Sequence, residues 1–197
     1  MRKLIVTNIV SLDGYYEGPG QNVMALPMDE SFDAYCAERL GTADTLLLGR
    51  RTYDQFRSFW PDVVSSPAAT PAQQEISRRD NAIQKLVVSN SAATADQTAP
   101  WTDTTRIVGR GEAHEQIAEL KRGDGGDILI FGSRTLWNDL LVAGLVDELH
   151  VMLGPVVLGD GTPAFGTDAV PPLQLIGTQA FECSANLVVK YAPQPAA

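Results

Sequence analysis

Hydrophobic residues along the chain fall into short apolar runs separated by stretches with helical spacing. The runs predict strands over five ranges: 4–10, 45–49, 85–89, 105–108 and 127–131. Between them, apolar positions recur every three or four residues in three stretches: 32–41, 112–122 and 136–144. Gly41, Gly123 and Gly144 are expected to end these helices. Strands that alternate with helices predict an α/β fold with a mostly parallel sheet covered on both faces.

One helix start and the C-terminal strands complete this picture. The N-cap, N1 proline and N3 glutamine of a capping box are Thr70, Pro71 and Gln73, and the helix should run to about Ile83. Strand patterns return in three late stretches: 146–157, 173–181 and 186–191. Because no helix separates the last two, we expect the sheet to end in an antiparallel hairpin, followed by a disordered tail over about 192–197.

Composition narrows the classes of function. The 197 residues suit a single domain spanning 1–197, and the net charge of -9 argues against nucleic acid as a partner. Cys36 and Cys183 have no metal-ligand spacing and neither histidine has a zinc-like partner arrangement, so no metal site is expected. The apolar start of the chain is too short for a signal peptide or a membrane span, which predicts a cytoplasmic protein with no membrane partner.

Candidate chemistry lies at three predicted strand ends, which should share one edge of a parallel sheet. Gly49, Arg50, Arg51 and Thr52 follow one strand, and two guanidinium groups there suit a phosphate. A solvated arginine pair is the alternative, but positive charge at a helix start opposes the helix dipole. Gly132–Ser133 precedes another helix, where Ser133 could also serve as an ordinary cap, and Ser89–Asn90 reads equally well as a turn.

At these motifs the sequence resembles the dihydrofolate reductase-like superfamily, and within it the reductase domain of the bifunctional riboflavin-biosynthesis deaminase/reductase. The resemblance rests on 45–53, which is similar to the G-R-x-T cofactor turn, and on 130–136, which is similar to the glycine-rich pyrophosphate turn. Two further stretches, 11–14 and 144–161, resemble the riboflavin-type branch.

The resemblance implies a three-layer α/β/α dihydrofolate reductase-like fold, NADPH as the cofactor, and a homodimer. Carried over by position, the cofactor-binding residues are Gly49, Arg50, Arg51, Thr52, Ser89, Asn90, Gly132, Ser133, Arg134, Thr135 and Leu136. The chain departs from the family in having no deaminase zinc motif and no evident residues for a ribityl phosphate.

Residues near the reacting groups are less well defined. We expect Asp13 to assist proton transfer, although Asp-Gly is equally a turn. Asp29 is a candidate for holding a pterin-like ring, and an N-cap is its alternative role. Tyr15 and Trp60 are further substrate candidates, and Tyr16 and Phe56 could complete an apolar wall.

Three functions therefore fit the sequence. The first is an NADPH-dependent reductase of a pyrimidine-ribose or pterin-like small molecule, similar to 5-amino-6-(5-phosphoribosylamino)uracil reductase. The second is a true dihydrofolate reductase. The third is a non-catalytic nucleotide- or drug-binding module that keeps the cofactor cradle.

Overall fold

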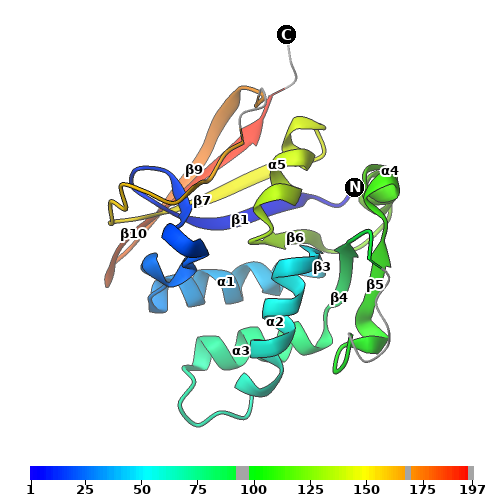
Figure 1. The fold of residues 1–197 in the computed structure, drawn as a ribbon, viewed down its shortest axis with the longest axis horizontal. Coiled ribbons are helices and arrows are strands. Elements are labelled where there is room, and N and C mark those ends of the chain that lie inside the picture. The colour runs from blue at the N-terminus through cyan, green and yellow to red at the C-terminus, as the bar shows by residue number, and fades with distance from the viewer. Residues whose placement is uncertain (92–97, 167–169, 195–197) are drawn as a thin grey trace.

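A central sheet of eight strands organises the computed structural model, which describes residues 1–91, 98–166 and 170–194 (Figure 1). The strand order is β5-β4-β3-β6-β1-β7-β10-β9. The strands are β1 (Leu4–Ser11), β3 (Ala43–Gly49), β4 (Gln84–Val88), β5 (Thr105–Val108), β6 (Asp127–Phe131), β7 (Glu148–Gly154), β9 (Leu173–Phe181) and β10 (Ser184–Pro193). All pairings are parallel from β5 to β7, while β10 pairs antiparallel with both β7 and β9. This confirms the predicted α/β class and the antiparallel C-terminal hairpin.

In the described residues, five α-helices cover the two faces of this sheet and complete three layers. They are α1 (Glu30–Thr42), α2 (Arg50–Val63), α3 (Pro71–Ala82), α4 (Arg110–Arg122) and α5 (Arg134–Val142). In the view of Figure 1, α1, α2 and α3 lie below the sheet and α5 lies above it.

The alternation of side chains along β3 shows how the layers are held together. Leu47 packs in a core with residues of α4 and α5, whereas Leu46 and Leu48 pack in a second core with residues of α1, α2 and α3. Successive residues of a strand point to opposite faces, so an uninterrupted apolar run is what a strand buried on both faces requires. These two cores fix the helices that surround the candidate site.

Several predicted boundaries need correction. Gly41 does not end its helix, because α1 continues to Thr42. The strand expected over 146–157 is the shorter β7, Glu148–Gly154. The tail prediction was wrong at its start, because Ala192 and Pro193 pair with β9 and extend β10; residues 195–197 lie outside the described residues.

Two short strands were not predicted from the sequence. β2 (Tyr15–Glu17) and β8 (Thr162–Pro163) pair antiparallel in a separate small sheet beside β1. The predicted capping box at Thr70 is confirmed, with the hydroxyl of Thr70 accepting from the backbone N–H of Gln73 at 3.2 Å. Among the described helices, none is long and apolar enough to cross a membrane.

Candidate functional site

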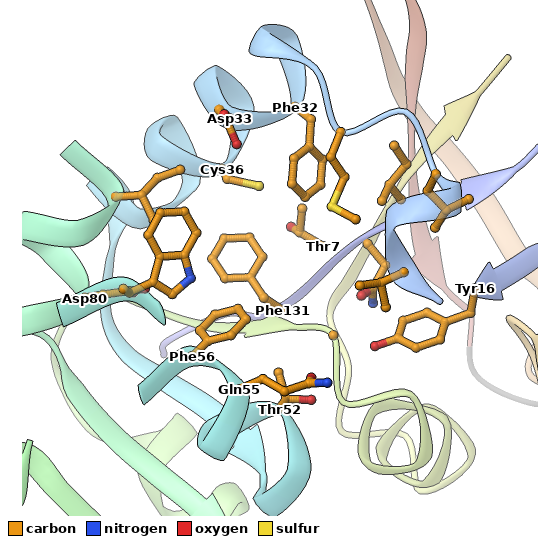
Figure 2. A pocket seen from close by; sticks show the side chains of 18 residues that line it. Thr7, Tyr16, Phe32, Asp33, Cys36, Thr52, Gln55, Phe56, Asp80 and Phe131 are labelled. Atoms are coloured by element: carbon orange, nitrogen blue, oxygen red, sulfur yellow. The ribbon is translucent and has the colours of Figure 1, made fainter. Parts of the chain in front are cut away.

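A cavity of about 190 Å³ lies between α1 and α2, against β1 and the end of β6. Thr7, Asn8 and Ile9 of β1 line it together with Phe131 of β6 (Figure 2). Most of the remaining wall is apolar or aromatic and comes from the helices: Phe32, Cys36, Phe56, Trp60 and Ile76. A concave site with flat aromatic walls suits a planar ligand.

Two carboxyl groups interrupt this apolar lining, one on each of two helices. Asp33 of α1 accepts a hydrogen bond from the side-chain nitrogen of Gln73 at 2.9 Å, and burial raises the pKa of its carboxyl. Asp80 of α3 is fully buried, and burial raises its pKa to about 7, although the charge of Lys85 acts in the opposite direction. Both groups therefore hold a proton at higher pH than an exposed aspartate does.

The substrate residues chosen from the sequence are only partly in this cavity. Trp60 lines it, but Asp29 and Tyr15 do not, and Tyr16 takes the position expected for Tyr15. Asp29 is the N-cap of α1, accepting from the backbone N–H of Ser31 at 3.0 Å, and it also accepts from the hydroxyl of Ser184 at 2.6 Å. The carboxylate of Asp29 thus ties α1 to the C-terminal hairpin.

The strand ends predicted to carry the cofactor residues are neighbours, because β4, β3 and β6 are adjacent and parallel. The helices that follow β3, β5 and β6 begin after Gly49, Gly109 and Ser133, and none of these residues provides a side-chain cap. By contrast, α1 and α3 are capped by Asp29 and Thr70. Uncapped helix starts leave backbone N–H groups available to an anion.

Two of these turns are joined by reciprocal hydrogen bonds. The hydroxyl of Thr52 accepts from the backbone N–H of Ser133 at 3.0 Å, and the hydroxyl of Ser133 accepts from the backbone N–H of Gly49 at 2.8 Å. The alternative role of Ser133, as a cap of its own helix, is not observed, since its hydroxyl accepts from Gly49 across the turn.

Glycine is required at position 132 for two reasons. Its φ is +56°, and a Cβ there would lie 3.0 Å from both the Thr52 methyl carbon and the Tyr16 hydroxyl oxygen. Thr52, Gly132 and Tyr16 all line the cavity, so the glycine turn and the cavity share a border. Burial raises the pKa of Tyr16 to about 12, so its hydroxyl keeps its proton there.

The two arginines do not act as a parallel pair. The Arg50 Nε atom lies 2.8 Å from an Asp54 carboxylate oxygen, and a terminal nitrogen of Arg50 is buried with no partner among the described residues. Arg51 reaches the other way and forms an ion pair of 3.2 Å with the buried Glu17 of β2. The geometry leaves Arg50 with unused donor capacity at the start of α2.

The remaining cofactor candidates have mixed environments. The side-chain oxygen of Asn90 accepts from the backbone N–H of Arg110 at 2.9 Å, which links the turn after β4 to the start of α4. The Ser89 hydroxyl accepts from the backbone N–H of Ser91 at 3.1 Å. The Arg134 side chain donates to the backbone oxygen of Phe165 at 3.0 Å. Two other residues of the first turn of α5 differ in exposure: Thr135 is exposed and Leu136 is buried.

The carboxylate of Asp13 is bound by backbone groups of the loop after β7. Its carboxylate accepts from the backbone N–H groups of Leu158 and Gly159, at 3.1 and 2.7 Å, and is not part of the cavity lining. Hydrogen bonds from Ser11 and Gly159 lower the pKa of Asp13 to about 2. An exposed carboxylate of this kind is ionised at neutral pH, which argues against the expected role of Asp13 in proton transfer.

Sequence reasoning missed Asp33 and Asp80 as residues that line the cavity. Neither carries a signal in the sequence, since each lies in a helix stretch rich in charged residues.

A mostly parallel sheet that is covered by helices on both faces and ends in an antiparallel hairpin gives this protein the dihydrofolate reductase-like fold. The chain belongs to the RibD C-terminal domain family, whose model matches residues 2–188. This confirms the resemblance found in the sequence.

Individual relatives agree with this assignment. The chain is 30% identical over 189 residues to YyaP, an uncharacterised protein of Bacillus subtilis strain 168, covering 95% of this chain and 94% of the relative. A protein of Shewanella sp. PV-4 assigned provisionally to riboflavin biosynthesis has a similar crystal structure, with a TM-score of 0.72, 22% identity, and coverage of 98% and 99% of the two chains. Dihydrofolate reductase from Enterococcus faecalis, solved with NADP(H), matches with a TM-score of 0.58 and 15% identity, covering 97% of this chain and 96% of its own.

Proposed function

We propose that this protein is a cytoplasmic, NADPH-dependent reductase that acts on a small pyrimidine- or pterin-like molecule, as riboflavin-type reductases do. The observation that carries the proposal is the shared border between the glycine turn and the cavity. Gly132 and Thr52 belong to both, so a cofactor on the turn and a planar acceptor in the cavity would lie side by side. Hydride transfer requires mainly such alignment and the exclusion of water.

The cofactor cradle fits a dinucleotide on three counts. The starts of α2 and α5 lack side-chain caps from the residues that precede them, so each has backbone N–H groups for phosphate oxygens. Any side chain at position 132 would approach Thr52 and Tyr16, so glycine keeps that space open. Arg50 has a buried nitrogen with no partner among the described residues, which suits the 2′-phosphate of NADPH. NADPH, when bound, supplies a hydride.

The chain's own residues would bind and shield the acceptor. Thr7 and Asn8 line the cavity, and the hydroxyl oxygen of Thr7 and the amide nitrogen of Asn8 are buried without partners in the described structure. Buried polar groups without partners are costly in a folded protein, and a polar ligand would offset that cost. Phe56 and Trp60 would stack on or enclose a flat ring.

The direct test is cofactor oxidation. Addition of NADPH should quench or shift the tryptophan fluorescence of the protein. In the presence of pyrimidine or pterin acceptors, the absorbance of the reduced nicotinamide should fall as the cofactor is oxidised. Binding without oxidation across such a panel would instead favour a non-catalytic nucleotide-binding module. Preferred oxidation with dihydrofolate would favour the second candidate, a true dihydrofolate reductase.

A further inference from the structure

The phenol of Tyr16 lies where the glycine turn meets the cavity. Tyr16 lines the cavity from β2, and a Cβ at Gly132 would lie 3.0 Å from its hydroxyl oxygen. Figure 2 shows the phenol directed towards Thr52 and Gln55 of α2. Because Gly132 and Thr52 form the border between the turn and the cavity, a ligand that spans this border would contact the Tyr16 hydroxyl.

The proton of this hydroxyl is available to a ligand. In the described structure no side chain hydrogen-bonds to the Tyr16 oxygen, and this oxygen is not closed off from solvent, unlike those of Asp80. The backbone N–H of Arg134 donates towards the oxygen and so leaves the phenolic proton unused. Burial raises the pKa of Tyr16 to about 12, so the hydroxyl is protonated throughout the neutral range.

The strand that carries Tyr16 is anchored at the next residue. The buried carboxylate of Glu17 accepts from the Thr162 hydroxyl at 2.9 Å and forms the 3.2 Å ion pair with Arg51. β2 also pairs with β8, whose backbone accepts from the Arg134 side chain. The first turns of α2 and α5 therefore both hold β2, which fixes the phenol relative to the two cofactor turns.

The other acidic groups of the described lining are poorly placed for contact with a ligand at this border. Figure 2 shows Asp33 and Asp80 on the opposite side of the cavity from Tyr16. The oxygens of Asp80 have almost no accessible surface, Gln73 donates to Asp33, and Cys36 is buried. Tyr16 is thus the acid of the described lining that adjoins the glycine turn.

The rest of the lining indicates the kind of acceptor. Besides Tyr16, four aromatic side chains surround the cavity: Phe32, Phe56, Trp60 and Phe131. No lysine, arginine or histidine is among its described lining residues. An acceptor there is polarised by a neutral O–H group rather than by a cation. A flat apolar ring that carries one carbonyl or imine group suits these surroundings.

We propose that Tyr16 is the proton donor of the reductase, and that its hydroxyl binds the carbonyl oxygen or imine nitrogen next to the carbon that receives the hydride. This inference rests on the proposed function, which supplies a reduced nicotinamide as the hydride donor. As the new C–H bond forms, the C=O or C=N π bond breaks and its electron pair moves to the oxygen or nitrogen. That atom takes the phenolic proton, and the nicotinamide is left oxidised.

The surroundings of Tyr16 also support the return of the proton. The phenolate formed in this step is stabilised by the backbone N–H of Arg134 and by the charges of Arg51 and Arg134, against the charge of Glu17. It regains a proton from water, which restores the phenol for the next turnover.

The first test is binding without cofactor, which needs no turnover. The probes are 2-acetylnaphthalene and 2-isopropenylnaphthalene, which share one shape but differ in the carbonyl oxygen. Fluorescence titration gives the ratio of their affinities for each variant. Tyr16→Phe keeps the ring and loses only the hydroxyl, so the ratio should shift about 3- to 10-fold against the ketone. Tyr15→Phe, one residue away and outside the cavity lining, is the control and should leave the ratio unchanged.

Three outcomes of this titration overturn the proposal. The first is an unchanged affinity ratio in Tyr16→Phe. The second is an equal loss of affinity for both probes, which would assign Tyr16 a role in shape alone. The third is a wild type that binds neither probe.

The second test is turnover with an acceptor that the wild type reduces. Tyr16→Phe should lower kcat about 100-fold or more while its affinity for NADPH stays within about 3-fold of wild type. A kcat within about 3-fold of wild type overturns the role in proton donation. NADPH binding and oxidation by the wild type decide the proposed function, whereas the affinity ratio of the two probes decides the role of Tyr16, so the two can fail separately.

Discussion

The hydroxyl of Thr52 and the backbone N–H of Ser133 are joined by a buried hydrogen bond of 3.0 Å across 81 residues of sequence. This bond connects the first turn of α2 to the glycine turn before α5, and the Ser133 hydroxyl returns a second bond to Gly49. The two bonds thereby fix the distance between the turn after β3 and the turn after β6. A cradle for a cofactor that contacts both turns needs such a fixed distance.

Removing this acceptor should therefore affect both stability and cofactor binding. Thr52→Val keeps the shape of the side chain but leaves the buried N–H of Ser133 unpaired, which should cost about 1–3 kcal/mol in the free energy of unfolding. NADPH should also bind more weakly. Denaturant unfolding and fluorescence titration measure the two effects, and Thr178→Val, at an exposed position of β9, is the control that should change neither. Unaltered stability in Thr52→Val would mean that the bond contributes nothing.

Cofactor choice should depend on the two arginines at the start of α2. Replacing Arg50 and Arg51 with Ala should weaken NADPH binding by about 2–4 kcal/mol before allowance for solvent exposure, and NADH binding far less. We expect Arg50→Ala to account for most of the loss, because Arg50 is the less exposed of the two and has a nitrogen without a partner among the described residues. Parallel titrations with both cofactors test this, with Arg78→Ala on α3 as control. Equal losses for NADPH and NADH would contradict it.

Asp13 should prove dispensable for turnover. Asp13→Asn retains an oxygen that can accept from the backbone N–H of Leu158 or Gly159, so the loop should keep its conformation. Because the pKa of Asp13 is lowered to about 2, its carboxylate stays ionised at all pH values near neutrality. Its titration therefore contributes nothing to the pH dependence of the rate in that range. Steady-state rates with an accepted substrate measure this. A drop of 100-fold or more in Asp13→Asn would restore Asp13 as a catalytic residue.

Asp80 should make stability depend on pH. Its folded pKa of about 7 lies above the ordinary aspartate pKa of 3.8, so folding is favoured with the proton bound. That contribution is complete below about pH 4 and is lost as pH rises towards 7. Asp80→Asn should therefore gain about 2–4 kcal/mol over wild type at pH 8 and little at pH 4. Thermal unfolding at the two pH values decides this, and an equal effect at both would contradict it.

We also propose a homodimer through the C-terminal hairpin. β9 is an edge strand of the sheet, and three large apolar side chains are exposed on the hairpin: Leu175, Ile176 and Leu187. An exposed apolar edge strand readily pairs with another chain. Light scattering should give a dimer for the wild type and a monomer for Ile176→Lys. A monomeric wild type at micromolar concentration would remove the proposal.

The sequence predicted the sheet far better than the cavity. β1, β4, β5 and β6 were placed within a residue or so, because strands buried on both faces are continuous apolar runs. Tyr15, the tyrosine chosen from the sequence, does not line the cavity, whereas its neighbour Tyr16 does. In a strand such as β2, a one-residue change moves a side chain to the other face, so Tyr16 faces the cavity instead.

Asp33 and Asp80 could not have been found from the pattern of residues. Both lie in helices whose charged residues are expected to face solvent. They become buried only because α1 packs against α3, a contact between helices about 40 residues apart that includes the bond from Gln73 to Asp33. Tertiary packing, not local pattern, creates this part of the site.

The position of β1 has a consequence for how the chain folds. Leu4 pairs with Ile128 on one side, and Ile5 pairs with Glu148 on the other. β1 therefore leaves the ribosome before both of its partner strands, which are made more than 120 residues later. Closing such long loops before any pairing energy is gained slows folding. During synthesis, the apolar run Leu4–Val10 stays unpaired until most of the protein exists, and in that interval it is a target for chaperones.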